Sequence, residues 1–117
     1  MPISNLDQIR DAMRSFAAER DWDQFHSPKN LAMALSVEAS ELLEHFQWIT
    51  EEQSKALAGE KLTAVKHELA DVLIYLVRLA DKLNVDLLQA VDEKIVLNAN
   101  KYPVDKSKGN SRKYSEF

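Results

Sequence analysis

The sequence predicts an all-α protein of four helices. Its apolar residues recur at intervals of three and four, which is the spacing of a helix face. Only two glycines and three prolines occur, which is too few for the turns that would connect a sheet of many strands. The 117 residues suffice for one domain and are too few for two. Because 45% of the residues are hydrophobic, four helices cannot hide all the apolar surface of one copy, so we expect a homo-oligomer.

The first helix is expected from about residue 6 to about residue 20. Ser4 or Asn5 can cap its N-terminus, since both side chains accept hydrogen bonds from free backbone N–H groups. The segment 22–27 that follows is predicted to be a loop with two aromatic residues and a histidine. The apolar face of this helix consists of Leu6, Ile9, Met13, Phe16 and Ala17.

The second helix is predicted to begin at Pro28, with Ser27 as its N-cap, and to run to about Trp48. Residues 50–59 form a polar, glutamate-rich connector in which a short helical turn can form. The third helix is expected from about Glu60 to Leu83.

The fourth helix is predicted to start after Asp86, its N-cap, and to stop before Pro103, because the residue ahead of proline disfavours a helix. Residues 104–117 are rich in lysine, serine, glycine and asparagine. We therefore expect a helical domain over 1–103 and an irregular basic tail over 104–117.

Charge and composition exclude several functions. The net charge of −4 disfavours binding to a nucleic-acid polymer, although divalent cations can still bridge carboxylates to one nucleotide. The absence of cysteine rules out disulfides and thiolate metal sites and fits a reducing compartment. No secretory signal is visible, and no apolar run approaches the roughly 20 residues that span a bilayer. The sequence thus predicts a cytoplasmic protein without a membrane partner.

Two acidic pairs carry the predicted chemistry. Glu38 and Glu41 lie in the second helix, and Glu68 and Asp71 lie in the third. The spacing places each pair on one helix face. Carboxylates that face the interior of a bundle are costly unless cations neutralise them, and such oxygen ligands suit Mg²⁺ or Mn²⁺. Glu38 is the central residue of an apolar stripe formed by Leu31, Ala34, Leu35, Leu42, His45 and Ile49.

Other interpretations of these acids stay open. A lone Glu-x-x-Glu pair is usually a solvated helix face, but two pairs, one inside an apolar stripe, favour a metal site. His45 shares the face of Glu38 and is either a ligand or, more commonly for a histidine, a packed residue. A di-iron carboxylate bundle would carry Glu-x-x-His on paired helices, and neither pair has this form.

A second group of residues could form a nucleotide pocket around the acids. Aromatic rings can stack on a base, lysine can bind phosphate, and asparagine can bind a sugar or a base edge. Taken singly, each aromatic residue is more often part of a core and each lysine is more often solvated. The group consists of Trp22, His26, Lys29, Asn30, Trp48, Tyr75, Lys94, Asn98, Lys101 and Tyr102.

The acidic pattern resembles the signature of the all-α nucleoside triphosphate pyrophosphatases, the MazG-like group: Glu38-x-x-Glu41, 26 residues, then Glu68-x-x-Asp71. Segments 16–26, 28–31, 46–48, 71–77 and 111–114 are similar to the dCTP pyrophosphatase branch of that group. The likeness extends from about residue 9 to about residue 116. It implies a four-helix MazG-like bundle, assembled as a dimer or a dimer of dimers with sites completed across subunits.

The resemblance also implies roles for individual residues. Mg²⁺, for which Mn²⁺ can substitute, would be held by Glu38, Glu41, Glu68 and Asp71. Trp22 and Trp48 would flank the base. The sugar and the phosphates would be held by Lys94, Asn98 and Tyr102, with Arg112 and Lys113 of the tail over the phosphates.

The predicted function is hydrolysis of a deoxynucleoside triphosphate, dCTP or a modified dCTP, to monophosphate and pyrophosphate, which cleans the nucleotide pool. Glu41 is the candidate for orienting or deprotonating the attacking water, with Glu38 as the second choice. Met13 stands where the animal enzymes are expected to have a histidine that contacts the base, so dUTP, dATP or a damaged triphosphate are alternative substrates. A non-catalytic, metal-stabilised helical interaction module is the alternative from another class.

Overall fold

The computed structural model describes residues 2–117, and all regular elements of this range are helices. The predicted all-α class is therefore confirmed. The chain divides into two compact units, Met1–Asn84 and Val85–Phe117. Among residues 2–117, no helix combines the length and the apolar character that crossing a bilayer requires.

The first unit begins with α1, Leu6–Glu19, whose N-cap is Asn5, one of the two predicted candidates. The Asn5 side chain accepts a hydrogen bond of 2.8 Å from the backbone N–H of Gln8. The segment predicted to be a loop contains a short 3₁₀ turn, Asp23–Phe25.

Helix α2, Pro28–Glu44, begins where predicted, because the Ser27 side chain accepts a hydrogen bond from the N–H of Asn30. Its predicted end near Trp48 is wrong by about four residues. The backbone N–H groups of His45 and Phe46 bond to carbonyls three residues back, so the helix tightens and ends. Thr50 then caps the short helix α3, Glu51–Ser54, with a complete capping box, which confirms the predicted helical turn in the connector.

Helix α4, Gly59–Lys82, matches the predicted third helix to within one residue at each end. Its first residue, Gly59, has φ of +61°, a conformation that favours glycine. The second unit begins with α5, Leu87–Lys101, and the predicted N-cap Asp86 accepts a hydrogen bond from the N–H of Gln89.

The tail that was expected to be irregular contains two helical turns, α6, Val104–Ser107, and a 3₁₀ turn, Tyr114–Glu116. The ring of Tyr102 packs edge-on against those of Tyr114 and Phe117, each with centroids 6.0 Å apart. These aromatic contacts give the tail a local structure, which its polar composition alone does not predict. A domain boundary at residue 103 stays a prediction.

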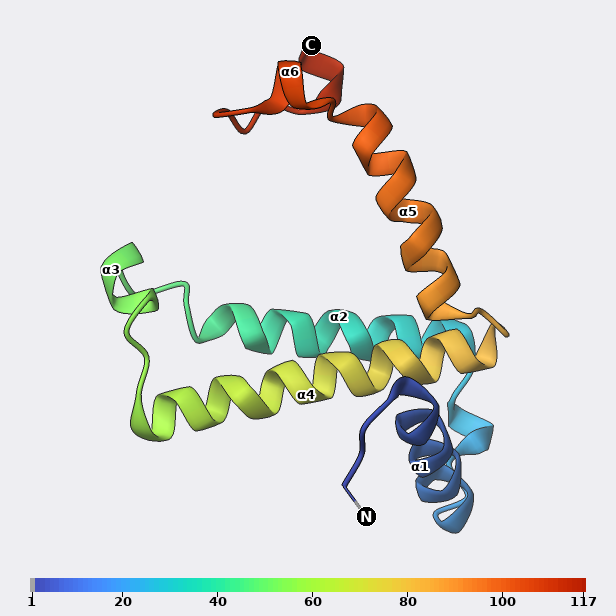
Figure 1. Ribbon diagram of the computed structural model, residues 1–117. Coiled ribbons are helices and arrows are strands. Elements are labelled where there is room, and N and C mark those ends of the chain that lie inside the picture. The colour runs from blue at the N-terminus through green and yellow to red at the C-terminus, as the bar shows by residue number, and fades with distance from the viewer. Residues whose placement is uncertain (1) are drawn as a thin grey trace. The chain divides into compact units, whose positions relative to one another are not determined.

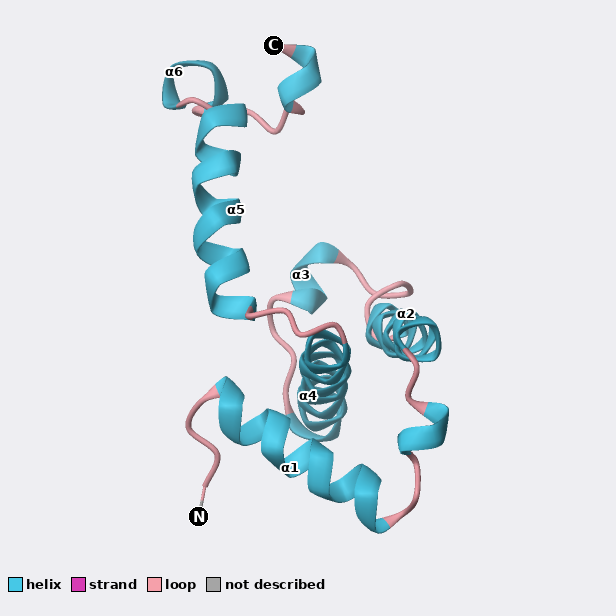
Figure 2. Ribbon diagram, turned by 90° about the vertical axis from the view of Figure 1, so that its right-hand side faces the viewer, coloured by secondary structure: helices cyan, strands magenta, loops and turns pink. Residues whose placement is uncertain are grey.

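Within the first unit, α2 and α4 run antiparallel side by side, and α1 packs on α4 near the C-terminal end of α4 (Figures 1 and 2). Glu38 lies on the inner face of α2, as predicted, since all of its predicted stripe neighbours are buried or half-buried. The core of the unit consists of Ala17, Leu31, Val65, Val77 and Ala80.

By helical spacing, the apolar side of the third helix is expected to hold Val65, Leu69, Val72, Leu76, Leu79 and Leu83, and this side is only partly buried. Val65 is buried, whereas Leu69, Leu76 and Leu83 are exposed. Helix α4 buries instead a side that includes the charged residue Arg78. Periodicity alone located the apolar face, but it could not show that this face is divided between the core and the surface.

Candidate metal and nucleotide site

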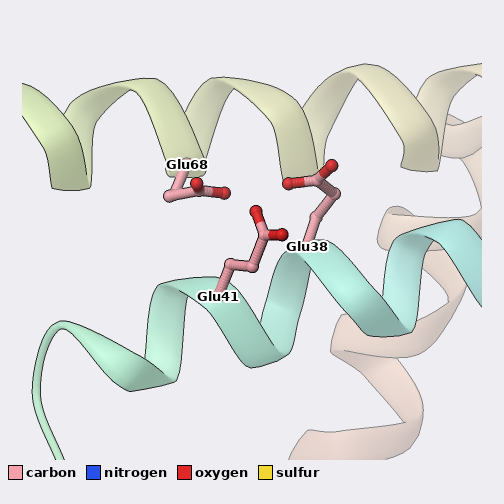
Figure 3. Close-up of side chains that lie close together, drawn as sticks. All are labelled: Glu38, Glu41 and Glu68. Atoms are coloured by element: carbon pink, nitrogen blue, oxygen red, sulfur yellow. The ribbon is translucent and has the colours of Figure 1, made fainter.

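Three glutamates meet between two antiparallel helices (Figure 3). Glu38 and Glu41 lie one turn apart on α2, and Glu68 points toward them from α4. Each is half-buried, and each offers a carboxylate oxygen within 4.8 Å of the other two. Three of the four predicted metal ligands are thus brought together by the packing of α2 on α4.

The electrostatics of this cluster are unfavourable without a cation. Oε2 of Glu38 and Oε2 of Glu68 are buried without a hydrogen-bond partner. Burial, together with the neighbouring Glu68 and Glu41, raises the pKa of Glu38 to about 7. Unpartnered buried oxygens and like charges both cost free energy, and a hard divalent cation would relieve both. The residues therefore fit the Mg²⁺ or Mn²⁺ that the sequence predicts.

Asp71, the fourth predicted ligand, lies one turn after Glu68 on α4 and is half-buried. It is not part of the group of three, and neither is His45. Its negative charge contributes to the raised pKa values of Glu38 and Tyr75. Asp71 also lines an adjacent cavity, so it connects the acidic cluster to a binding space.

This cavity has a volume of about 300 Å³, the small end of the range of ligand sites. It brings together Trp22, His26 and Tyr75, three of the residues predicted to bind the nucleotide, with Asp71. Ring contacts fix Trp22 in place, with centroids 5.6 Å from Phe16 and 6.4 Å from His26. The complete lining is Met13, Phe16, Trp22, His26, Asp71, Ile74, Tyr75 and Arg78.

Phe16, Ile74 and Arg78 were not predicted as site residues. Phe16 and Ile74 occupy apolar helix positions that look like ordinary core. Arg78 could have been found, because it lies two turns after Asp71 on the same face of α4. A charged residue at the extension of an acidic face is therefore a sequence signal for a further site residue.

Comparison with known proteins agrees with this geometry. The sequence model of the MazG-like family matches residues 33–117. The chain belongs to the MazG-like family. It is 48% identical to dCTP pyrophosphatase 1 of Mus musculus and 45% identical to dCTP pyrophosphatase 1 of Homo sapiens. Both alignments span 118 residues and cover 99% of this chain and 69% of the relative.

A solved structure supports the same assignment. The crystal structure of a pyrophosphatase from Archaeoglobus fulgidus matches this MazG-like chain with a TM-score of 0.79 and 36% sequence identity. The match covers 88% of this chain and 96% of the archaeal one. The resemblance inferred from the acidic signature is therefore confirmed.

Other predicted nucleotide ligands of the MazG-like chain are not among the residues that line the cavity. Trp48 follows the C-terminal end of α2 and is 87% exposed, whereas Trp22 precedes the N-terminal end. The 17 residues of α2 separate these ends by about 25 Å. Lys29 and Asn30 are exposed in the first turn of α2, where the Asn30 side chain donates a hydrogen bond of 3.0 Å to the carbonyl of Phe25.

The remaining predicted ligands belong to the second unit. Lys94, Asn98 and Lys101 share one face of α5 by their spacing, and all are exposed. The ammonium of Lys101 lies 4.9 Å from the ring centroid of Tyr114. Arg112 and Lys113 are exposed just before the last 3₁₀ turn.

Proposed function

We propose that this chain hydrolyses dCTP, or a modified dCTP, to the monophosphate and pyrophosphate with Mg²⁺, and so cleans the nucleotide pool. Its membership of the MazG-like family, with close pyrophosphatase relatives, makes it a nucleoside triphosphate diphosphatase. The observation that carries the proposal is the position of three glutamates with two unpartnered oxygens next to a cavity lined by Trp22 and Tyr75.

The acidic residues divide the chemistry between them. Glu38, Glu41, Glu68 and Asp71 would hold Mg²⁺, which when bound neutralises phosphate charge and lowers the pKa of water. Glu41 orients or deprotonates the water that attacks the α-phosphorus, with Glu38 as the second candidate. The bond from the α-phosphorus to the bridging oxygen breaks, and pyrophosphate leaves with that oxygen.

The cavity residues would bind the nucleoside. Trp22 is 43% exposed, which leaves part of its indole available for stacking on a base. Tyr75 and His26 line the same cavity, and each would offer a polar atom to the sugar or to a base edge. Met13 is also in the lining, and a thioether offers no strong donor for a base. For this reason dUTP, dATP and damaged triphosphates stay alternative substrates.

A second copy of the chain would complete the site. Trp48 lies too far from Trp22 to stack on the same base within one copy, so we propose that the Trp48 side chain reaches the base in the neighbouring subunit. Burial of exposed apolar surface favours such a dimer or dimer of dimers. One stripe of α4 carries exposed leucines at helical spacing: Leu62, Leu69, Leu73, Leu76 and Leu83.

The second unit would supply cations and hydrogen-bond groups to the phosphates and the sugar. The proposed ligands are Lys94, Asn98, Lys101, Tyr102, Arg112 and Lys113, with Lys29 and Asn30 from α2. A cytoplasmic location, without a nucleic-acid polymer or a membrane as partner, stays a prediction from the net charge of −4 and the cysteine-free sequence.

The test is pyrophosphate release from a panel of ribo- and deoxynucleoside triphosphates with and without Mg²⁺. We expect release from dCTP that requires Mg²⁺ and that Glu38→Gln and Glu41→Gln abolish. Glu44→Gln is the matched control, because Glu44 is exposed on the same helix outside the cluster. Release from another base would overturn the cytosine preference alone. No release from any triphosphate would favour the non-catalytic interaction module.

A further inference from the structure

Arg78 is a buried cation with an unassigned role. Its side chain is only 5% exposed, and it lies on α4 in the wall of the cavity beside His26. A guanidinium remains charged in proteins, so its burial must be offset by specific partners. Those partners come from α4 itself and from the segment between α1 and α2.

Each part of the guanidinium has its own acceptor. Nη2 pairs with the carboxylate of Asp23 from the 3₁₀ turn, and Nη1 lies 3.5 Å from Asp81 Oδ2. Nε donates a hydrogen bond of 3.2 Å to Nδ1 of His26. The same two aspartates have further cations, since Lys82 lies 3.1 Å from Asp23 and Arg14 lies 2.6 Å from Asp81. The network therefore holds Arg78 in one orientation.

The contact determines where His26 carries its hydrogen. Arginine has donors and no acceptor, so Nδ1 of His26 must accept with its lone pair. In a neutral imidazole the hydrogen then resides on Nε2. Burial, followed by the charge of Arg78, lowers the pKa of His26, with Lys82 acting in the same direction and Asp23 in the opposite one. The neutral ring is therefore the form present at neutral pH.

We infer that Arg78 is a positioning residue that fixes His26 as the Nε2–H tautomer, so that His26 offers a hydrogen-bond donor to an acceptor atom of the nucleotide in the cavity. A carbonyl oxygen or an unprotonated ring nitrogen of a base is the matching chemistry. The identity of this ligand rests on the proposed function, whereas the tautomer does not. Arg78 acts through His26 and needs no contact with the reacting phosphates.

The tautomer can be measured directly by long-range ¹H–¹⁵N correlation spectra of the full chain labelled with ¹⁵N-histidine. The sequence has three histidines, and the signal that His26→Gln removes identifies His26. We expect the Nε2–H form at neutral pH in the wild type and in Lys82→Met, and a mixture of tautomers in Arg78→Met. Lys82→Met is the matched control, because it removes a neighbouring cation that bonds to Asp23 and leaves the hydrogen bond from Arg78 to Nδ1 of His26 in place. A wild-type His26 in the Nδ1–H or imidazolium form would overturn the inference without any variant having to fold.

The donor role has a separate test. Saturating dCMP should shift the Nε2 signal of His26, and Arg78→Met should raise the KM for dCTP by about tenfold, the effect of one hydrogen bond, with a smaller change in kcat. His26→Gln, whose amide also donates, should bind dCTP better than His26→Leu. Equal dCTP affinity of His26→Leu and the wild type would overturn the donor role while the diphosphatase function stands. Absence of turnover in the wild type would instead overturn the proposed function and leave the tautomer result intact.

Discussion

Glu38 of α2 and Glu68 of α4 face each other across the helix pair, and each buries a carboxylate oxygen that lacks a hydrogen-bond partner. Such oxygens destabilise the fold unless a ligand neutralises them. The packing of α2 on α4 therefore creates a cluster of carboxylates whose negative charge no cation within residues 2–117 neutralises. Stability and metal binding should be coupled through these two residues.

Glu68→Gln is expected to change stability in opposite directions with and without metal. In EDTA the variant should be more stable than the wild type by about 1–2 kcal/mol, because one of three repelling carboxylates becomes neutral. Mg²⁺ at 100 times its Kd should stabilise the wild type by about 2.7 kcal/mol and the variant by far less. Denaturant unfolding followed by circular dichroism measures both effects.

Glu44→Gln is the control for this experiment, because it removes one exposed carboxylate from α2 and leaves the cluster intact. It should respond to Mg²⁺ as the wild type does. If Mg²⁺ raised the free energy of unfolding of Glu68→Gln as much as that of the wild type, the cation would bind somewhere other than this cluster.

The acidic cluster was predictable from sequence because helix geometry fixes which residues share a face. Glu38 and Glu41 had to be neighbours once α2 was assigned, and the apolar residues around Glu38 showed that this face is buried. That α2 packs against α4 could not be predicted from local patterns, because it depends on how the whole unit packs. For the same reason the ion pairs of Arg78, whose partner Asp23 is 55 residues away in the chain, could not be predicted from local patterns.

Helix boundaries were predictable where a cap defines them. Ser27 and Asp86 act as the predicted N-caps through side-chain hydrogen bonds, and Asn5 does so as one of the two predicted candidates. The end of α2 had no such marker, since neither glycine nor proline follows it, and apolar spacing continued to Trp48. The tail was misjudged because three aromatic residues, among many polar ones, determine its structure by packing on each other.

Mixing two inactive variants tests whether Trp22 and Trp48 serve one base from different subunits. Trp22→Ala and Trp48→Ala should each lose dCTP turnover as homo-oligomers, because each site lacks one side of the stack. Subunit exchange between them should restore about a quarter of wild-type activity, since half of the dimers are mixed and each mixed dimer has one complete site. Pyrophosphate release before and after exchange measures this recovery. No recovery after confirmed exchange would place both tryptophans in one subunit's site or outside it.

Asp71→Asn tests whether Asp71, which lies beside both the acidic cluster and the cavity, contributes to Mg²⁺ binding. The variant removes a negative charge that acts on Glu38, and we expect the affinity for Mg²⁺ to fall about 10- to 100-fold. Isothermal titration calorimetry without nucleotide measures the change. Asp92→Asn, at an exposed position of α5, should bind Mg²⁺ as the wild type does. Unchanged Mg²⁺ affinity in Asp71→Asn would assign Asp71 to the cavity alone.

The ion pair between Arg14 of α1 and Asp81 of α4 should make stability depend on pH. Arg14 donates two hydrogen bonds, of 2.6 and 2.8 Å, to the Asp81 carboxylate and lowers its pKa. A carboxyl group with a lowered folded pKa stabilises the fold above its unfolded pKa, and this contribution is lost as pH falls through the folded value. Arg14→Gln should therefore be less stable than the wild type at neutral pH, and the difference should shrink below about pH 4.

Urea unfolding at neutral and at acidic pH measures this difference. Arg10→Gln is the control, because Arg10 lies on the same helix, forms ion pairs with the exposed Asp7 and Asp11 of that helix, and acts on the pKa of Asp81 only as a weaker, more distant charge. Its effect on stability should be small at both pH values, since exposed pairs within one helix contribute little. A difference between Arg14→Gln and the wild type that stays constant as the pH falls would mean that Arg14 stabilises α1 on α4 through packing of its stem rather than through the charge of Asp81.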